Sequence, residues 1–244
     1  MVASTSLVMA ARRYCTATDQ DEQGDVASYA ELTSCQIEGE TLTSQTASFH
    51  FQLGVQLLKK EEYRESINEF REGLKQAPNT ADAHHNIGHA LLGLQKYSEA
   101  IEELETALRI KPGQADSYND LGYAYMKLAR YDESIAAFEQ ALLHNPLSPT
   151  AHNLLGAVHL ETKNLSAAMR AYQRALRIDP SIALAHMHLG HIYFQQEEFD
   201  EAISEYQAAL RLDPTLKQAR KRLAWSYIGK KQFLKGVKEW FVPL

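Results

Sequence analysis

The sequence has few of the features that define a disulfide-bonded or membrane-spanning protein. Of its 244 residues only two are cysteines, Cys15 and Cys35, and both precede the regular part of the chain. They cannot form a disulfide framework for the fold. No run approaches the roughly 20 consecutive apolar residues that a membrane-spanning helix requires. With 45% hydrophobic residues, 23% charged residues and a net charge of −6, the composition is that of an ordinary soluble protein.

The sequence also lacks the short motifs of common enzymes. It has no Gly-rich phosphate loop, nucleophile elbow or paired-carboxylate motif. His85 and His89 are spaced i, i+4 and would share a helix face, as metal ligands can. However, no cysteine or carboxylate is placed by spacing to complete a metal site. We therefore expect a protein that is not an enzyme and that needs no cofactor or metal.

What the chain does contain is a repeat of 34 residues. Five prolines recur at this interval: Pro78, Pro112, Pro146, Pro180 and Pro214. If each repeat is numbered so that its proline stands at repeat position 32, the repeats are 47–80, 81–114, 115–148, 149–182 and 183–216. A fixed period in this range is typical of stacked-repeat proteins, in which each unit buries its apolar faces against its neighbours.

Each repeat is predicted to form two amphipathic helices joined by a short turn. Large residues recur at repeat positions 7, 11 and 24, and small residues at positions 8, 20 and 27. Glycine inside a helix costs about 1 kcal/mol relative to alanine, so its recurrence at position 8 predicts close packing of the two helices. Capping preferences predict that the second helix begins at position 18. That position holds Ser98, Asp132, Ser166 and Asp200.

These residues resemble the tetratricopeptide repeat (TPR) family. The family pattern has a bulky residue at position 4, Leu-Gly at 7–8, Tyr at 11, Ala at 20, Phe at 24, Ala at 27 and Pro at 32. The resemblance covers residues 47–216 and continues into a partial copy. It implies an all-α fold, a right-handed α-solenoid of helix-turn-helix repeats. Because this fold is used with many different partners, the resemblance specifies structure better than function.

The two ends of the chain differ from the repeats and from each other. Residues 1–46 carry seven acids and two bases and show no periodicity, so we expect a disordered tail with an acidic linker. The first 18 residues contain no acid and include Arg12 and Arg13, a composition compatible with a transit peptide. Residues 217–244 carry eight bases and one acid and continue the repeat register. We interpret them as a partial sixth repeat whose basic helices cap the stack.

In this family the first helices of successive repeats line a concave groove. Carried over position by position, the resemblance implies a partner-binding groove formed by Phe51, His85, His89, Asn119, Tyr123, Met126, Asn153, Met187, His191, Phe194 and Trp225. Aromatic, Met, His and amide side chains suit a partner helix or an extended segment with apolar anchors. Alternatively, the N-terminal tail or a second copy covers several of these residues. Three further histidines stand at the bulky position 4 and are expected to be structural: His84, His152 and His186.

The sequence predicts a non-catalytic protein-interaction scaffold, an adaptor or complex-assembly factor. The alternative is a structural or self-associating subunit that uses its acidic tail and basic C-terminal end, including one that docks to a membrane-associated complex. A protein or peptide partner is expected in either case, and its identity and the oligomeric state remain open.

Two partner classes and the compartment can be considered from charge and composition. Family members that bind chaperone C-terminal tails hold the terminal carboxylate with bases, but Asp116 and Asp120 occupy two of those positions. Chaperone tails are therefore not expected, and the acidic repeats would repel nucleic acid. We expect a soluble cytoplasmic protein, or an organellar (mitochondrial or plastid) one if the N-terminus is a transit peptide.

Overall fold

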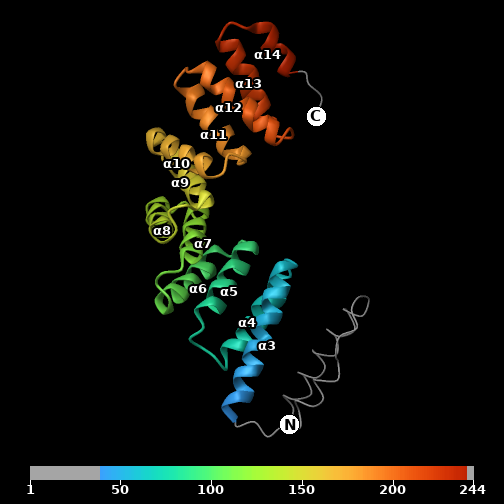
Figure 1. The fold of residues 1–244 in the computed structure, drawn as a ribbon, viewed down its shortest axis with the longest axis vertical. Coiled ribbons are helices and arrows are strands. Elements are labelled where there is room, and N and C mark those ends of the chain that lie inside the picture. The colour runs from blue at the N-terminus through green and yellow to red at the C-terminus, as the bar shows by residue number, and fades with distance from the viewer. Residues whose placement is uncertain (1–38, 241–244) are drawn as a thin grey trace, which may run out of the picture. The chain divides into compact units, whose positions relative to one another are not determined.

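The computed structural model describes residues 39–240, with side chains described for residues 46–237. Two compact units are distinguished, Met1–Thr43 and Ser44–Leu244, and the repeats belong to the second. The expectations for residues 1–38 lie outside the described residues. Throughout the described range the regular elements are helices, in consecutive helix-turn-helix pairs (Figure 1). They are α3 (Gly39–Lys59), α4 (Tyr63–Leu74), α5 (Ala81–Gly93), α6 (Tyr97–Ile110), α7 (Ala115–Lys127), α8 (Tyr131–His144), α9 (Pro149–Glu161), α10 (Leu165–Ile178), α11 (Ala183–Gln195), α12 (Phe199–Leu212), α13 (Lys217–Gly229) and α14 (Phe233–Trp240).

The first helix starts earlier than the repeat pattern predicts. Helix α3 begins at Gly39 and has 21 residues, whereas the other first helices have 13. The expected disordered tail is therefore wrong for residues 39–46. The 34-residue pattern arises from residues that pack within and between repeats, so it cannot show a helical extension that precedes the first repeat. Once a helix has nucleated, it can extend by one hydrogen bond per residue without any such packing.

The two helices of a pair approach closely at the glycine of position 8, as the sequence predicts. A Cβ atom added to Gly122 would lie 2.9 Å from the Phe138 ring, and one added to Gly156 would lie 2.9 Å from the Tyr172 ring. The small residue at position 20 adds a hydrogen bond in two repeats. The Ser134 hydroxyl, for example, donates to the Gly122 carbonyl at 2.7 Å. The glycine thus provides the space that the large side chain at position 24 fills.

The turn between the two helices differs from the predicted one. The second helices begin at position 17, so the predicted capping residues at position 18 lie inside the first turn. Of the residues described as preceding these helices, only Asn164 caps with its side chain, accepting from the Ala167 amide at 3.2 Å. The chain reverses through a left-handed residue at position 15 in every pair: Glu61, Gln95, Ala129, Lys163, Glu197 and Lys231, with φ between 56° and 61°.

This turn has the hydrogen bonding of a Schellman motif. The amide that follows the left-handed residue donates to the carbonyl five residues earlier, as from Lys96 to Leu91 at 2.9 Å and from Arg130 to Tyr125 at 2.9 Å. These bonds satisfy carbonyl groups at the end of the first helix that would otherwise lack a partner. Each first helix is thereby ended in the same way, which keeps the pairs alike.

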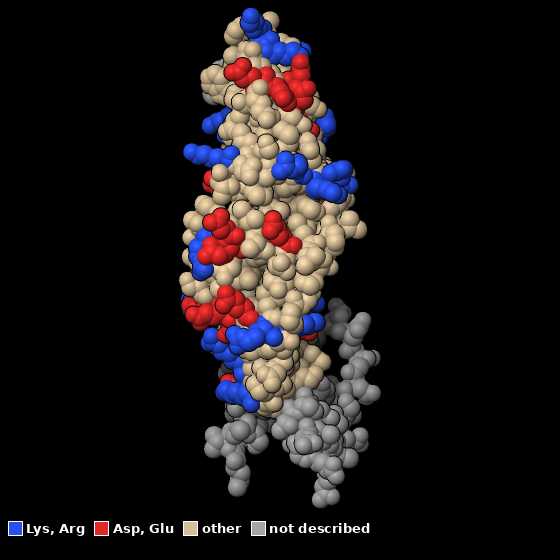
Figure 2. All heavy atoms as spheres, turned by 90° about the vertical axis from the view of Figure 1, so that its left-hand side faces the viewer, with Lys and Arg blue, Asp and Glu red and all other residues tan. Residues whose placement is uncertain are grey.

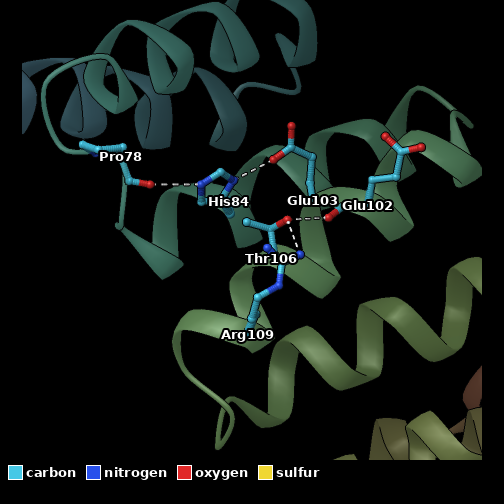
Figure 3. Close-up of polar contacts among 6 residues, drawn as sticks. All are labelled: Pro78, His84, Glu102, Glu103, Thr106 and Arg109. Atoms are coloured by element: carbon cyan, nitrogen blue, oxygen red, sulfur yellow. Dashed lines mark hydrogen bonds and ion pairs between the residues drawn. The ribbon is translucent and has the colours of Figure 1, made fainter.

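The histidines at position 4 are structural, as expected. His84 lies between Glu103, whose carboxylate is 2.7 Å from Nδ1, and the carbonyl of Pro78, which is 3.3 Å from Nε2 (Figure 3). His186 repeats both contacts with Glu205 and Pro180. His152 keeps the contact with a proline carbonyl. His50, which the sequence analysis did not single out, is 2.7 Å from Glu69.

The histidine contacts at position 4 join a first helix both to its own second helix, through Glu103, and to the preceding turn, through Pro78. Within α6 itself, the Thr106 hydroxyl donates to the carbonyl of Glu102 one turn earlier and accepts from Arg109 at 3.4 Å (Figure 3).

Neighbouring repeats share their apolar residues. Each second helix contacts the first helix of the next repeat, as α6 does α7 and α12 does α13. Ile203 of α12, for example, belongs to one buried cluster with Leu223 of α13. First helices also contact each other directly, α5 with α7, α7 with α9 and α11 with α13. The chain is therefore an α-solenoid, in which packing is between neighbours.

Candidate functional site

Two hollows open on the surface formed by the first helices. The N-terminal hollow, of about 640 Å³, lies between α3 and α5 over Phe70 of α4, and its lining includes Phe51, Val55 and Asn86. The central hollow, of about 310 Å³, draws on α5, α7 and α9, with one residue from α4. Its lining residues are Tyr63, His89, Leu92, Gly93, Asn119, Asp120, Tyr123, Thr150 and Leu154. Three residues of the predicted groove, His89, Asn119 and Tyr123, therefore lie together here.

The central hollow combines apolar walls with a charged edge. His89 Nδ1 lies 2.9 Å from Asp120 Oδ2, and this hydrogen bond raises the pKa of His89 above its ordinary value although burial opposes the shift. The Lys127 ammonium group lies over the Tyr123 ring, 5.1 Å from its centroid. Leu92 is buried and Leu154 half-buried. A ligand in this hollow would therefore meet an aromatic ring, aliphatic side chains, a carboxylate, the His89 ring and, over Tyr123, the Lys127 ammonium group.

Two amides near the hollow have an unused acceptor. The Oδ1 atoms of Asn119 and Asn153 are buried and make no hydrogen bond to any described residue. Both residues stand at repeat position 5, on the adjacent first helices α7 and α9. A buried polar atom without a hydrogen-bond partner lowers the stability of the fold, so packing alone does not account for an asparagine at these two positions.

His85 is held differently from His89, one turn away on α5. Its Nδ1 lies 2.9 Å from the hydroxyl of Ser117, and burial lowers its pKa. The carboxylates of Asp120, Asp116 and Asp82 are close enough to oppose that shift. The first helices of the second and third repeats thus gather acidic groups around two histidines.

The C-terminal half of the same surface has a basic residue at its edge. Arg222 of α13 donates to His191 Nδ1 at 2.6 Å. Burial, and secondly the charge of Arg222, lower the pKa of His191 to about 4. His191 is therefore neutral at ordinary pH, and Arg222 supplies the positive charge at this end of the surface.

The remaining groove residues lie outside the two hollows. Met187 and Phe194 are half-buried and pack against the cluster that contains Tyr206 and Leu223, so they also serve the core. Met126 and Asn153 are half-buried, and Trp225 is 52% exposed. Of the predicted residues, Phe51 thus lines the N-terminal hollow, and the trio His89, Asn119 and Tyr123 lines the central one.

Sequence reasoning missed several residues of the central hollow. Tyr63 belongs to a second helix, and the groove prediction considered first helices alone. Thr150 and Leu154 stand at positions 2 and 6 of the fourth repeat. The sequence argument uses Asp120 only as a residue that opposes a carboxylate ligand. Asp120 and Leu154 both stand at repeat position 6, directly after the groove position 5, and this shared position was the signal that could have placed them in the hollow.

The described residues show neither a metal cluster nor a membrane-spanning helix. Figure 2 draws the side of the molecule that faces left in Figure 1; on it Lys and Arg are interspersed with Asp and Glu, and much of the surface is uncharged. Among the described residues, no group of three or more His, Cys, Asp and Glu side chains is arranged to hold a metal ion. Nor is any helix in that range long and apolar enough to cross a membrane.

Family models match the central and C-terminal repeats. Tetratricopeptide repeat models match residues 119–183 and 183–216, and a TPR repeat model matches residues 91–129. Comparison with curated protein sequences gives no match.

Solved structures show the same fold at low sequence identity. PilF of Pseudomonas aeruginosa is 18% identical, with a TM-score of 0.73 over 81% of this chain and 90% of its own. MamA of Desulfovibrio magneticus RS-1 is 20% identical, with a TM-score of 0.64 over 70% of this chain and 97% of its own. YrrB, a TPR protein with an unusual peptide-binding site, is 22% identical, with a TM-score of 0.61 over 70% of this chain and 88% of its own.

Proposed function

Because the chain belongs to the tetratricopeptide repeat family, whose members are generally protein-interaction scaffolds, we propose that it works without catalysis as an adaptor that holds a segment of a partner protein against its first helices. The observation that carries this proposal is the central hollow, where His89, Asn119 and Tyr123 of successive first helices line one recess. YrrB, which shares the fold, has a peptide-binding site, and this similarity supports the proposal without identifying a ligand.

The chemistry of the hollow favours one class of partner segment. Leu92, Leu154 and the Tyr123 ring can cover an apolar side chain, which is the usual source of affinity at small interfaces. Asp120, which lines the hollow and is bonded to His89, can also pair with a cation, and Asp116 lies close to the neighbouring His85. We therefore propose a partner segment in which an apolar anchor stands close to a lysine or arginine. The same carboxylates disfavour a segment that ends in a free carboxyl group at this site.

A peptide-display selection on the purified chain tests this function. We expect the retained peptides to share an apolar residue near a basic one. Tyr123→Ala should weaken their binding about 10- to 100-fold, since truncating an anchor in a buried pocket costs about 1–3 kcal/mol. Asp120→Asn should weaken binding less and reduce its dependence on salt. Fluorescence polarisation of labelled peptides measures both effects.

The matched control is Leu143→Ala, because Leu143 is 68% exposed on the second helix α8, away from both hollows. This variant should bind like the unaltered chain. Circular dichroism should show the same helix content for all variants. Peptides that bind equally well to Tyr123→Ala would exclude the central hollow as their site. A selection that yields no shared pattern would count against the function itself.

A further inference from the structure

The last described helix exposes an apolar face. On α14, Phe233, Leu234 and Val237 are 60%, 89% and 50% exposed. The other side of the helix packs on α13, where a Cβ atom added to Gly236 would lie 2.8 Å from the Ala224 carbonyl oxygen. Because residues i, i+1 and i+4 lie within one third of a helix turn, these three side chains form a single outward strip. We call it the α14 face.

Inner repeats cover two of these three positions with the next helix, whereas position 18, occupied by Leu234, is exposed in each of the five complete repeats. Val237 stands at repeat position 21, where Ile67, Ile101 and Ile203 are only 5%, 6% and 9% exposed. Position 17, occupied by Phe233, is likewise covered elsewhere. The Phe199 ring lies against Gly229 of the next first helix, 2.7 Å from where a Cβ atom would be. Phe233 and Val237 therefore belong to the surface that an inner repeat offers to a following first helix, and Leu234 lies at its edge.

The other end of the stack offers the complementary surface. Helix α3 is a first helix with no described helix pair before it (Figure 1). Phe49, Leu53 and Leu57, spaced at four residues, are half-buried along it. Leu53 stands at position 7, where Ile87 and Leu223 of inner repeats are 0% and 2% exposed and cluster with the preceding second helix.

Charge distinguishes the candidate occupants of the α14 face. Residues 217–244 carry a net +7 and residues 1–46 a net −5. Two α14 faces brought together would place basic side chains such as Lys231 and Lys235 near their own copies, whereas Lys230 is paired with Asp200 of its own chain. In the sequence of a second chain, acidic residues precede helix α3 instead. Complementary charge of this kind fixes orientation and speeds association.

We propose that the α14 face binds helix α3 of a second copy of this chain, so that two stacks join head to tail. The junction reproduces the contact between second and first helices that already joins the repeats within one chain. Such a contact is heterologous, since each partner uses a different surface, and it leaves one free end on each side. Because one helix-to-helix junction is smaller than a standard stable interface, association is weak and depends on concentration.

Sedimentation velocity of the full chain tests the proposal. We expect the average mass to rise between about 10 μM and about 1 mM, the range in which weak complexes form. Val237→Glu, at a half-exposed site that inner repeats bury, should weaken association at least about 10-fold, because it places a charge in an apolar contact. The control Leu147→Glu changes a residue that is 72% exposed between α8 and α9, and it should associate like the unaltered chain.

Orientation requires a second measurement, which uses a mixture of isotope-labelled and unlabelled chains. A zero-length carbodiimide reagent joins lysines to carboxylates in direct contact, and mass spectrometry then separates links between copies from links within one. We expect links between copies to join Lys231 or Lys235 to acids of residues 19–40, and Val237→Glu to remove them, whereas Lys230 should link to Asp200 of its own chain.

Three results would overturn the proposal. The first is a chain that stays monomeric at every concentration. The second is a set of links confined to single chains, which would mean that the molecule covers its own α14 face. The third is association in which the N-terminal acids form no links, which would indicate pairing of two α14 faces or another contact.

Discussion

Replacing Tyr172 by phenylalanine should stabilise the protein. The Tyr172 side chain is fully buried at repeat position 24, and its hydroxyl makes no hydrogen bond to any described residue. Burial also raises the pKa of this phenol well above its ordinary value, with a smaller contribution from Glu161. The ring stacks on His188 with centroids 5.4 Å apart, and phenylalanine keeps that contact.

The magnitude follows from the cost of burying an unpaired polar group. A buried donor without a partner costs about 1–3 kcal/mol, and the space left by the lost oxygen returns part of that cost. The site accommodates phenylalanine, because Phe70 and Phe138 occupy the same repeat position at 1% and 0% exposure. We therefore expect Tyr172→Phe to raise the free energy of unfolding by about 1 kcal/mol.

Urea denaturation followed by circular dichroism measures this change, and hydrogen exchange in α9 and α10 shows whether it is local. The local measurement matters because repeat arrays can depart from two-state unfolding. Tyr125→Phe is the matched control, since the Tyr125 hydroxyl donates to Glu105 Oε1 at 2.8 Å. Losing that bond should destabilise the protein by about 0.5–1.5 kcal/mol. A Tyr172→Phe variant as unstable as Tyr125→Phe would refute the reasoning.

Three further predictions concern packing and titration. Phe138→Ala should cost about 3–5 kcal/mol of local stability, measured by hydrogen exchange in α7 and α8, because the ring is fully buried. Asp120→Asn should lower the pKa of His89 toward its ordinary value, seen in an NMR titration, and an unchanged pKa would exclude the hydrogen bond as the cause. Arg222→Gln should raise the pKa of His191 from about 4, though not fully, since burial is the larger cause. Because that folded pKa lies below the ordinary 6.5, protonation favours unfolding, and urea denaturation at several pH values should show stability falling between pH 6.5 and 4 less steeply in Arg222→Gln.

Most of the fold could be predicted from the sequence, because the same pair of positions packs together in every repeat. The glycine at position 8 and the large side chain at position 24 are two halves of one contact, and both recur in the sequence. The turn could not be predicted in the same way. Its left-handed residue is a non-glycine in every pair, such as Gln95 or Ala129, so no residue type marks it. The capping prediction failed for the related reason that a Schellman turn ends the first helix and fixes the start of the second.

The sequence could predict which positions of the first helices face the candidate site, but not which of them line a recess. A 34-residue period places Asn119 and Asn153 at the same position of adjacent helices, so the line of groove residues follows from counting. The recess itself depends on how far neighbouring side chains extend, which a position number does not encode. The contact between His89 and Asp120 joins residues 31 apart and depends on the angle between two repeats. Phe194, predicted for the groove, also packs into the core, because one side chain can serve both surfaces.

The shared turn has a consequence for the length of the molecule. Because the left-handed residue stands at the same point of every pair, the chain enters and leaves each 34-residue interval with the same backbone geometry. Deleting residues 96–129 would join Gln95 to Arg130, which occupies the site that Lys96 occupies now. Whole repeats could thus be removed or duplicated at these turns without designing a new junction, and the shortened or lengthened chain should still fold.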